Sequence, residues 1–132
     1  MADIRAALTH PPEWHAERRK GIGGSDASKI MSGDWHALWL DKTGRAEPED
    51  LSKSLPVAMG SFTEALNLYW FEMITDVKVT TENCEGLVSA DYPFMRANLD
   101  GRAQPNIFEA KHINAFAKAE KARERYYPQV QH

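Results

Sequence analysis

The chain has 132 residues, of which 42% are hydrophobic and 27% charged, and its formal net charge is −3. This length suits a single domain, and the apolar fraction is too high for a disordered chain. The negative charge excludes a basic protein that coats nucleic acid, although it still allows a local basic patch. Cys84 is the single cysteine, so an intrachain disulfide is impossible and a cysteine-based zinc site is not expected.

Nothing in the sequence predicts a membrane partner or export. No apolar run reaches the roughly 18 residues that a membrane span requires. The first twenty residues lack the apolar stretch of a signal peptide. Together with the cysteine count, this indicates a reducing, cytoplasmic setting.

The N-terminal part is expected to form short helices. Pro12 favours a helix start, and that helix should stop at Gly21. Residues 21–26 (Gly-Ile-Gly-Gly-Ser-Asp) read as a glycine-rich turn. Ser25 is a good N-cap for a helix that runs to about Met31.

Further helices follow along the chain. Asp34 is expected to cap a helix over 35–42 that ends at Gly44. Residues 45–53 are polar and predict a solvated loop. Over 56–73, apolar residues recur at steps of three and four, which predicts a long helix.

The C-terminal half predicts a small sheet and one more helix. Strands are expected at 77–80, 87–89, 94–100 and 107–111, and a helix at 115–126. Gly, Pro and Asn in 101–106 predict a hairpin between the last two strands. This order of elements indicates an α+β or α/β layered domain spanning residues 1–132.

The predicted hairpin brings acidic residues together. Side chains alternate along a strand, so Glu109 and Lys111 should share a face. Folding about Gln104–Pro105 places Asp100 opposite Glu109, with Cβ atoms roughly 4.5–5.5 Å apart. Two such carboxylates repel each other unless a cation lies between them, and Mg²⁺ suits this role. The Ala110 carbonyl could add a further oxygen.

Lys111 could orient or help to deprotonate a metal-bound water, or stabilise charge that develops on a phosphate. An ordinary solvated strand is the alternative, because an acidic residue two before a lysine is common, and Asp76-Val77-Lys78 is a second instance. Asp100 across the turn, beside apolar Leu99 and Phe108, strengthens the functional interpretation.

Glu64 lies within the predicted long helix, four residues after Gly60. It is either an exposed residue on the polar side or a third carboxylate that points at the metal. Gly60 would allow backbone or substrate to approach closely.

The glycine-rich turn follows three basic residues, Arg18-Arg19-Lys20. Backbone N–H groups, the Ser25 hydroxyl and the Arg18 guanidinium could hold a phosphate. The Gly-Lys-Ser/Thr ending of a P-loop is missing, and no strand precedes the turn as in a dinucleotide fingerprint. A tight turn with an N-cap serine is the alternative.

The remaining polar residues carry weaker signals. The five histidines show no paired metal-ligand spacing and are expected at the surface or in packing. Gln129 and Gln131 follow a Tyr-Tyr-Pro sequence and are either ordinary surface residues or neutral donors near a phosphate or an attacking water.

Five motifs in order resemble the YqaJ-like viral recombinase family. Its members are phage alkaline exonucleases related to lambda exonuclease, within the PD-(D/E)XK nuclease superfamily. The motifs are Arg18-Arg19-Lys20-Gly21-Ile22-Gly23-Gly24-Ser25-Asp26-Ala27, Gly60-Ser61-Phe62-Thr63-Glu64, Leu99-Asp100-Gly101, Glu109-Ala110-Lys111 and Tyr127-Pro128-Gln129-Val130-Gln131-His132.

The resemblance implies a mixed central sheet flanked by helices and a Mg²⁺-dependent exonuclease, with Mn²⁺ as a possible substitute, that removes 5′ mononucleotides from double-stranded DNA. It implies that Asp100, Glu109 and the Ala110 carbonyl hold metal and that Glu64 supports the site. Lys111 would be the catalytic lysine. Arg18 and Ser25 match positions that recognise the 5′-phosphate. Gln131 matches a glutamine near the attacking water, with Gln129 in possible support.

The resemblance also implies partners: double-stranded DNA, a single-strand annealing protein, and further copies in a ring. It places the protein in the cytoplasm of a bacterial host, encoded by a phage or prophage. Asp26 and the double glycine follow the YqaJ branch rather than lambda exonuclease. The chain stops at the last motif, so a C-terminal truncation is expected.

Two other functions stay open on the sequence. One is an endonuclease or nickase of the same superfamily, which would cut covalently closed circles. The other is a truncated, non-catalytic module for DNA binding or assembly, which need not bind metal at the hairpin.

Overall fold

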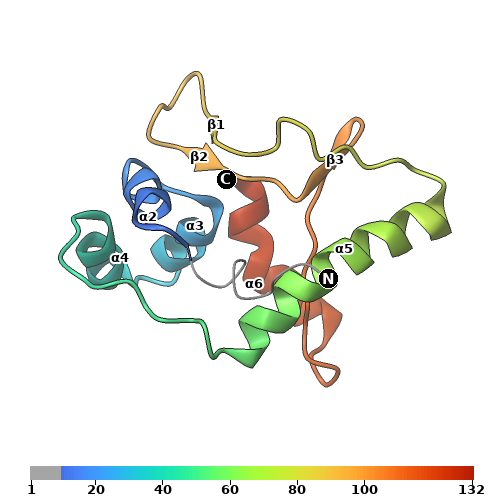
Figure 1. The fold of residues 1–132 in the computed structure, drawn as a ribbon, viewed down its shortest axis with the longest axis horizontal. Coiled ribbons are helices and arrows are strands. Elements are labelled where there is room, and N and C mark those ends of the chain that lie inside the picture. Colours follow the sequence, from blue (N-terminus) through green and yellow to red (C-terminus); the bar gives the residue numbers. More distant parts are fainter. Residues whose placement is uncertain (1–9) are drawn as a thin grey trace. The chain divides into compact units, whose positions relative to one another are not determined.

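The computed structural model describes residues 10–132 (Figure 1). The helices are α2 (Pro12–Arg19), α3 (Gly24–Met31), α4 (Trp35–Lys42), α5 (Leu55–Thr75) and α6 (Ala119–Gln131). The strands are β1 (Leu87–Val88), β2 (Arg96–Ala97), β3 (Gly101–Ala103) and β4 (Asn106–Phe108). Helices combined with short antiparallel strands confirm the α+β class.

The chain folds into two compact units, each assembled from separate stretches of sequence. The first contains Asp50–Glu85 and Leu99–His112, and therefore α5, β3 and β4. The second contains Pro11–Glu49, Gly86–Asn98 and Ile113–His132, and therefore the remaining described elements.

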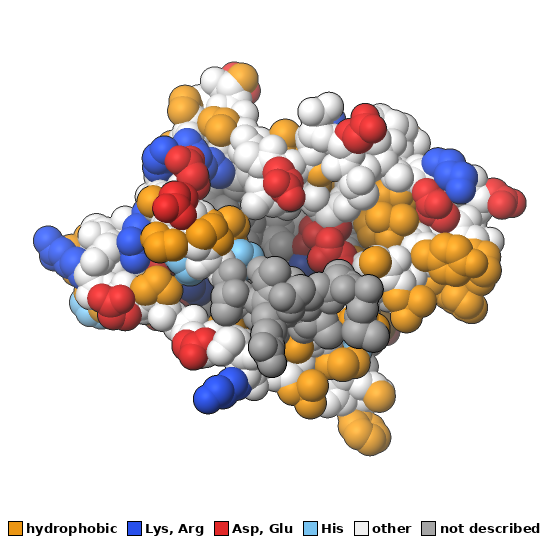
Figure 2. Space-filling model, in the orientation of Figure 1, with side chains coloured by type: hydrophobic (Ala, Val, Ile, Leu, Met, Phe, Trp, Pro, Cys, Tyr) orange, Lys and Arg blue, Asp and Glu red, His pale blue; other side chains and the backbone are white. Residues whose placement is uncertain are grey.

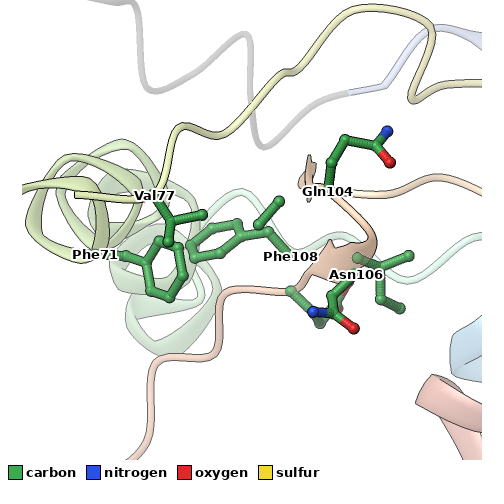
Figure 3. A pocket seen from close by; sticks show the side chains of 8 residues that line it. Phe71, Val77, Gln104, Asn106 and Phe108 are labelled. Atoms are coloured by element: carbon green, nitrogen blue, oxygen red, sulfur yellow. The ribbon is translucent and has the colours of Figure 1, made fainter. Parts of the chain in front are cut away.

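In the first unit, aromatic packing fastens the hairpin β3–β4 to α5. The Phe71 ring of α5 lies 5.2 Å from the Phe108 ring of β4, centroid to centroid. Figure 3 shows these two rings facing each other beside Val77, at an apolar pocket of about 510 Å³. This contact fixes the end of β4, and with it the residues that follow Phe108.

The hairpin also packs closely against the segment that follows α5. The backbones of Thr80 and Arg102 exchange two hydrogen bonds, of 2.9 and 2.8 Å. A Cβ added to Gly101 would lie 2.4 Å from Cγ1 of Val79, so this approach requires glycine. The expected strand over 77–80 is wrong, because only Thr80 forms a bridge.

In the second unit, the glycine-rich turn lies against the segment that leads into β2. Ile22 accepts a hydrogen bond from the Arg96 N–H (2.8 Å) and donates to the Phe94 carbonyl (2.7 Å). A Cβ on Gly21 would lie 2.5 Å from that Phe94 oxygen. At the other end of the chain, His132 Nε2 donates to the carbonyls of Ile22 (2.9 Å) and Arg96 (3.1 Å).

The predicted helices near the N-terminus are confirmed at α2, α3 and α4. Their caps differ from prediction. Gly23, not Ser25, is the N-cap of α3, and the Asp26 carboxylate accepts the Gly23 N–H (2.8 Å). Asp34 precedes α4 as expected, but its side chain forms no capping hydrogen bond. Gly44 has a positive φ of 69°, as expected for a residue that ends a helix.

The predicted strands shift along the chain. Of the expected strand 94–100, Arg96–Ala97 pairs with Leu87–Val88, and Met95 forms a single bridge with Ile22. Residues Gly101–Ala103, expected in the turn, form β3 instead. The described residues therefore hold two separate two-stranded antiparallel sheets in place of one mixed sheet.

The last helix begins at Ala119, later than predicted. The Asn114 side chain accepts the Phe116 N–H (2.8 Å), and the Asn114 carbonyl accepts the Ala117 N–H (2.8 Å). These bonds hold a turn where the helix was expected, because an asparagine side chain competes for backbone donors. The helix then continues through Pro128 to Gln131.

Large apolar side chains remain exposed on α5. They include Phe62, Leu66, Tyr69, Trp70, Met73 and Ile74. Figure 2 shows hydrophobic side chains gathered over the C-terminal end of this helix. Among the described helices, none is long and apolar enough to cross a membrane.

Two glycine variants test the close approach at Gly101. We expect Gly101→Ala to lower the free energy of unfolding by about 1–3 kcal/mol, because the stiff Val79 side chain must move. Gly60→Ala is the matched control in α5, where no other atom lies within 4 Å of the added Cβ. It should be neutral or stabilising by up to about 1 kcal/mol, because alanine favours helix. Urea unfolding measures both, and equal effects would contradict the packing described.

Candidate metal and phosphate sites

The hairpin register places Asp100 and Glu109 across from each other. Gly101 pairs with Phe108, Arg102 with Ile107, and Ala103 with Asn106. One step further along the same register brings Asp100 opposite Glu109, as the sequence predicted. The Ala110 N–H donates to Asp100 Oδ2 (2.6 Å), which holds the two chain segments together beyond the last strand pair.

Lys111 lies beside Glu109 on the same face. Its Nζ forms an ion pair with Glu109 Oε1, and both side chains are partly buried, with exposed fractions of 30% and 15%. This ion pair is consistent with the predicted placement of Glu109 and Lys111 on one face. An ammonium group and a carboxylate with limited access to water interact more strongly than they would on an open surface.

Glu64 on α5 belongs to the same charged cluster. The pKa of Glu64 is raised above its ordinary value of 4.5, chiefly because its carboxylate is partly shielded from water. The charges of Asp100 and Glu109 raise this pKa further, whereas Lys111 lowers it. The Glu64 side chain remains exposed overall. Glu64 is thus exposed, as one reading predicts, and its carboxylate interacts electrostatically with Asp100 and Glu109.

The cluster is not arranged as a finished metal site. Within residues 10–132, no group of three or more His, Cys, Asp or Glu side chains is placed to hold an ion. Glu109 is paired with Lys111, and Asp100 accepts from the Ala110 amide. Gly60 has no other part of the chain within 4 Å of a built Cβ. The metal-binding roles of Glu64, Asp100, Glu109 and Ala110 stay predictions.

His112 lies next to this cluster and was assigned only to surface or packing. Its Nδ1 lies 3.4 Å from the Thr63 hydroxyl of α5, one residue from Glu64. This contact links α5 to the segment that follows Lys111. The position of His112 next to Lys111 is the one sequence feature that could have indicated its place beside this cluster.

In the second unit, Arg18 and Ser25 lie together as predicted. Arg18 Nη2 donates to Ser25 Oγ (3.2 Å), and both residues are exposed. The Arg18 guanidinium also lies 4.8 Å from the centre of the Trp14 ring. The N-cap of α3 is Gly23, whose N–H donates to the Asp26 carboxylate, so the Ser25 hydroxyl is not used as a helix cap. An exposed guanidinium beside a hydroxyl at a helix start is a suitable arrangement for a phosphate.

The two glutamines lie on α6, in the unit that holds Arg18 and Ser25. A Cβ added to Gly24 would lie 2.9 Å from Cγ of Gln129, so Gln129 packs against the first turn of α3. Gln131 is exposed and is the residue before the last. The role of Gln131 near an attacking water, and support from Gln129, stay predictions.

Comparison with known proteins gives the family. The YqaJ-like viral recombinase domain matches residues 13–132 of this chain. The chain belongs to the YqaJ-like viral recombinase family. A Bacillus subtilis (strain 168) protein named "Uncharacterized protein YqaJ" is 38% identical over 130 residues, which covers 91% of this chain and 40% of that protein. This chain thus spans less than half the length of its YqaJ relative. No solved structure matches this chain.

The raised pKa of Glu64 predicts how stability depends on pH. The folded chain binds the Glu64 proton more tightly than the unfolded chain does, so ionisation of Glu64 disfavours the fold as pH rises. In a metal-free buffer, Glu64→Gln should raise the free energy of unfolding at neutral pH. This gain should vanish as pH falls below the ordinary Glu value of 4.5.

Glu72 on the same helix is the matched control with the opposite sign. The Val79 N–H and the Lys78 ammonium lower the pKa of Glu72. Glu72→Gln should therefore lower the free energy of unfolding at neutral pH, and the loss should vanish as pH falls through the lowered pKa. Denaturant unfolding between pH 3 and pH 8 compares the variants. Effects of the same sign would contradict the charge cluster.

Proposed function

We propose that this chain is a Mg²⁺-dependent deoxyribonuclease domain that removes 5′ mononucleotides from the ends of double-stranded DNA during phage recombination. Membership of the YqaJ-like viral recombinase family supports a role in recombination. The observation that carries the proposal is the electrostatic coupling of Glu64 to Asp100, Glu109 and Lys111. Three carboxylates and one ammonium group from separate parts of the sequence gather at one end of the hairpin.

The chemistry of these donors fits a divalent cation. Carboxylate and carbonyl oxygens are the ligands that Mg²⁺ prefers, and Mn²⁺ accepts the same donors. A cation would offset the like charges that raise the pKa of Glu64. Asp100, Glu109 and the Ala110 carbonyl would hold it, and Glu64 would support the site from α5. When bound, such an ion polarises the scissile phosphate and activates a water.

Lys111 would assist the attacking water and stabilise negative charge in the reaction. Its ammonium group pairs with Glu109, which supports a place for Lys111 beside the carboxylates that would hold the metal. There it can orient the attacking water or stabilise the negative charge that develops on phosphate oxygens. The family resemblance assigns Gln131 a role near the attacking water, with Gln129 in support.

Arg18 and Ser25 would recognise the DNA end. A 5′-phosphate carries more charge than an internal phosphodiester, and a guanidinium beside a hydroxyl can donate several hydrogen bonds to it. The 3.2 Å contact between the two side chains supports this role, because a phosphate that approaches one of them comes within reach of the other.

The finer features that the resemblance implies are part of this proposal. They include a PD-(D/E)XK core with a mixed central sheet in the whole protein, a ring of copies around DNA, and a single-strand annealing protein as partner. They also include work in the cytoplasm of a bacterial host. The YqaJ relative is longer than this chain, so each of these applies to the whole protein.

Replacement of Lys111 tests the nuclease chemistry. On a linear 5′-phosphorylated duplex with Mg²⁺, Lys111→Ala should reduce the digestion rate by about 100-fold or more. Lys78→Ala is the matched control, since Lys78 also stands two residues after an acidic residue but pairs with Glu72. The control should digest DNA at the wild-type rate. Full activity of Lys111→Ala would exclude the catalytic role.

A covalently closed circle distinguishes the exonuclease from its alternatives. We expect no cleavage of the closed circle under conditions in which the linear duplex is digested. Nicking or linearisation of the circle would indicate an endonuclease or nickase. Absence of cleavage of both substrates, with DNA binding retained, would indicate a non-catalytic module.

Replacement of Arg18 tests end recognition. Arg18→Ala should reduce the preference for 5′-phosphorylated over 5′-hydroxyl ends by about tenfold, because one charged hydrogen-bond donor is lost. Initial digestion rates on the two duplexes measure this preference. An unchanged preference would remove Arg18 from end recognition.

A further inference from the structure

A buried ion pair lies directly behind the predicted phosphate ligands. Asp26 is 1% exposed, and its Oδ2 lies 2.6 Å from Nζ of Lys42, whose side chain is 13% exposed. Asp26 neighbours Ser25 in α3, whereas Lys42 is the last residue of α4. The pair therefore joins two helices across sixteen positions of sequence.

Both members of the pair also hold the backbone of the phosphate site. Asp26 Oδ2 accepts the Gly23 N–H (2.8 Å), which fixes the turn before Ser25. Lys42 Nζ donates to the carbonyl oxygen of Arg18 (2.8 Å), at the end of α2. One carboxylate and one ammonium group thus connect the backbone segments that carry Arg18 and Ser25.

Stability alone explains this arrangement poorly. The free-energy cost of removing two charges from water is often larger than the gain from their attraction. A buried ion pair therefore seldom adds net stability. Asp26 Oδ1 is also buried and has no hydrogen-bond partner among the described residues, which adds a further cost. The pair costs free energy, yet it holds the two backbone segments that carry Arg18 and Ser25. The geometry that it imposes on these segments explains it better than stability does.

We infer that Asp26 and Lys42 are positioning residues that set the distance between Arg18 and Ser25 and so give the site its preference for a 5′-phosphate. This inference rests on the proposed function of Arg18 and Ser25 in end recognition. Neither residue of the pair contacts the phosphate. Their effect reaches it through the Gly23 N–H and the Arg18 carbonyl.

The test measures binding and does not require nuclease activity. Short duplexes that carry a 5′-phosphate or a 5′-hydroxyl are titrated in EDTA, and fluorescence anisotropy gives the ratio of the two dissociation constants. Asp26→Asn should reduce this ratio by about tenfold relative to wild type, because the hydrogen-bonded charge that orients the turn is lost. Lys42→Arg keeps the charge and should retain most of the preference.

Loss of one charge leaves the other buried without its partner, which can unfold the chain. A double variant is therefore measured beside the single ones. Asp26→Asn with Lys42→Met removes both charges and should also lose the preference while it remains folded by circular dichroism. Arg19→Met is the matched control. Arg19 Nε donates to the Asp41 carbonyl (3.2 Å), so its side chain links α2 to α4 through a hydrogen bond that involves neither Asp26 nor Lys42. It should keep the wild-type ratio.

The outcomes separate the two proposals. If wild type distinguishes the two ends and the folded double variant does so equally well, the positioning role is wrong and end recognition stands. A loss of preference in Arg19→Met as large as in Asp26→Asn would also overturn the positioning role, because general loosening of α2 would then explain both. If wild type shows no preference, end recognition by Arg18 and Ser25 is wrong, and the positioning role falls with it.

Discussion

The candidate active site depends on one constraint, the register of the hairpin β3–β4. Gly101 pairs with Phe108, so Asp100 and Glu109 are the next residues on the two chain segments, and like charges there repel. Packing of Phe108 on Phe71, and the space that Gly101 leaves for Val79, hold this register in place. Burial raises the pKa of Glu64, and the charges of Asp100 and Glu109 raise it further, which is consistent with concentrated negative charge at this end of the hairpin. Concentrated carboxylates of this kind suit a divalent cation, which is why the proposed chemistry centres on a metal.

Much of this site could be predicted from sequence because it is local. The turn residues around Gln104–Pro105 and the alternation of side chains place Asp100, Glu109 and Lys111 without knowledge of the rest of the fold. The strands themselves were harder. Whether 77–80 forms a strand depends on how many residues find a partner, and only Thr80 does.

Long-range polar contacts could not be predicted in the same way. Ser25 is predicted to cap α3, but Gly23 is the N-cap, and the Asp26 carboxylate accepts the Gly23 N–H and also pairs with Lys42 of α4. No spacing or motif connects Lys42 with the glycine-rich turn. The sequence did indicate the pair Arg18 and Ser25, because a basic lead-in and a glycine-rich turn stand side by side. What keeps that pair in place emerges only in the folded chain.

The most direct test of the central claim is a calorimetric titration of the protein with Mn²⁺ and Mg²⁺. We expect saturable binding to wild type and to Glu72→Gln, and loss of that binding in Asp100→Asn and in Glu109→Gln, each shown to be folded. Binding that is unchanged in both hairpin variants would contradict a metal site at the hairpin, and the nuclease mechanism proposed for this chain would fall with it.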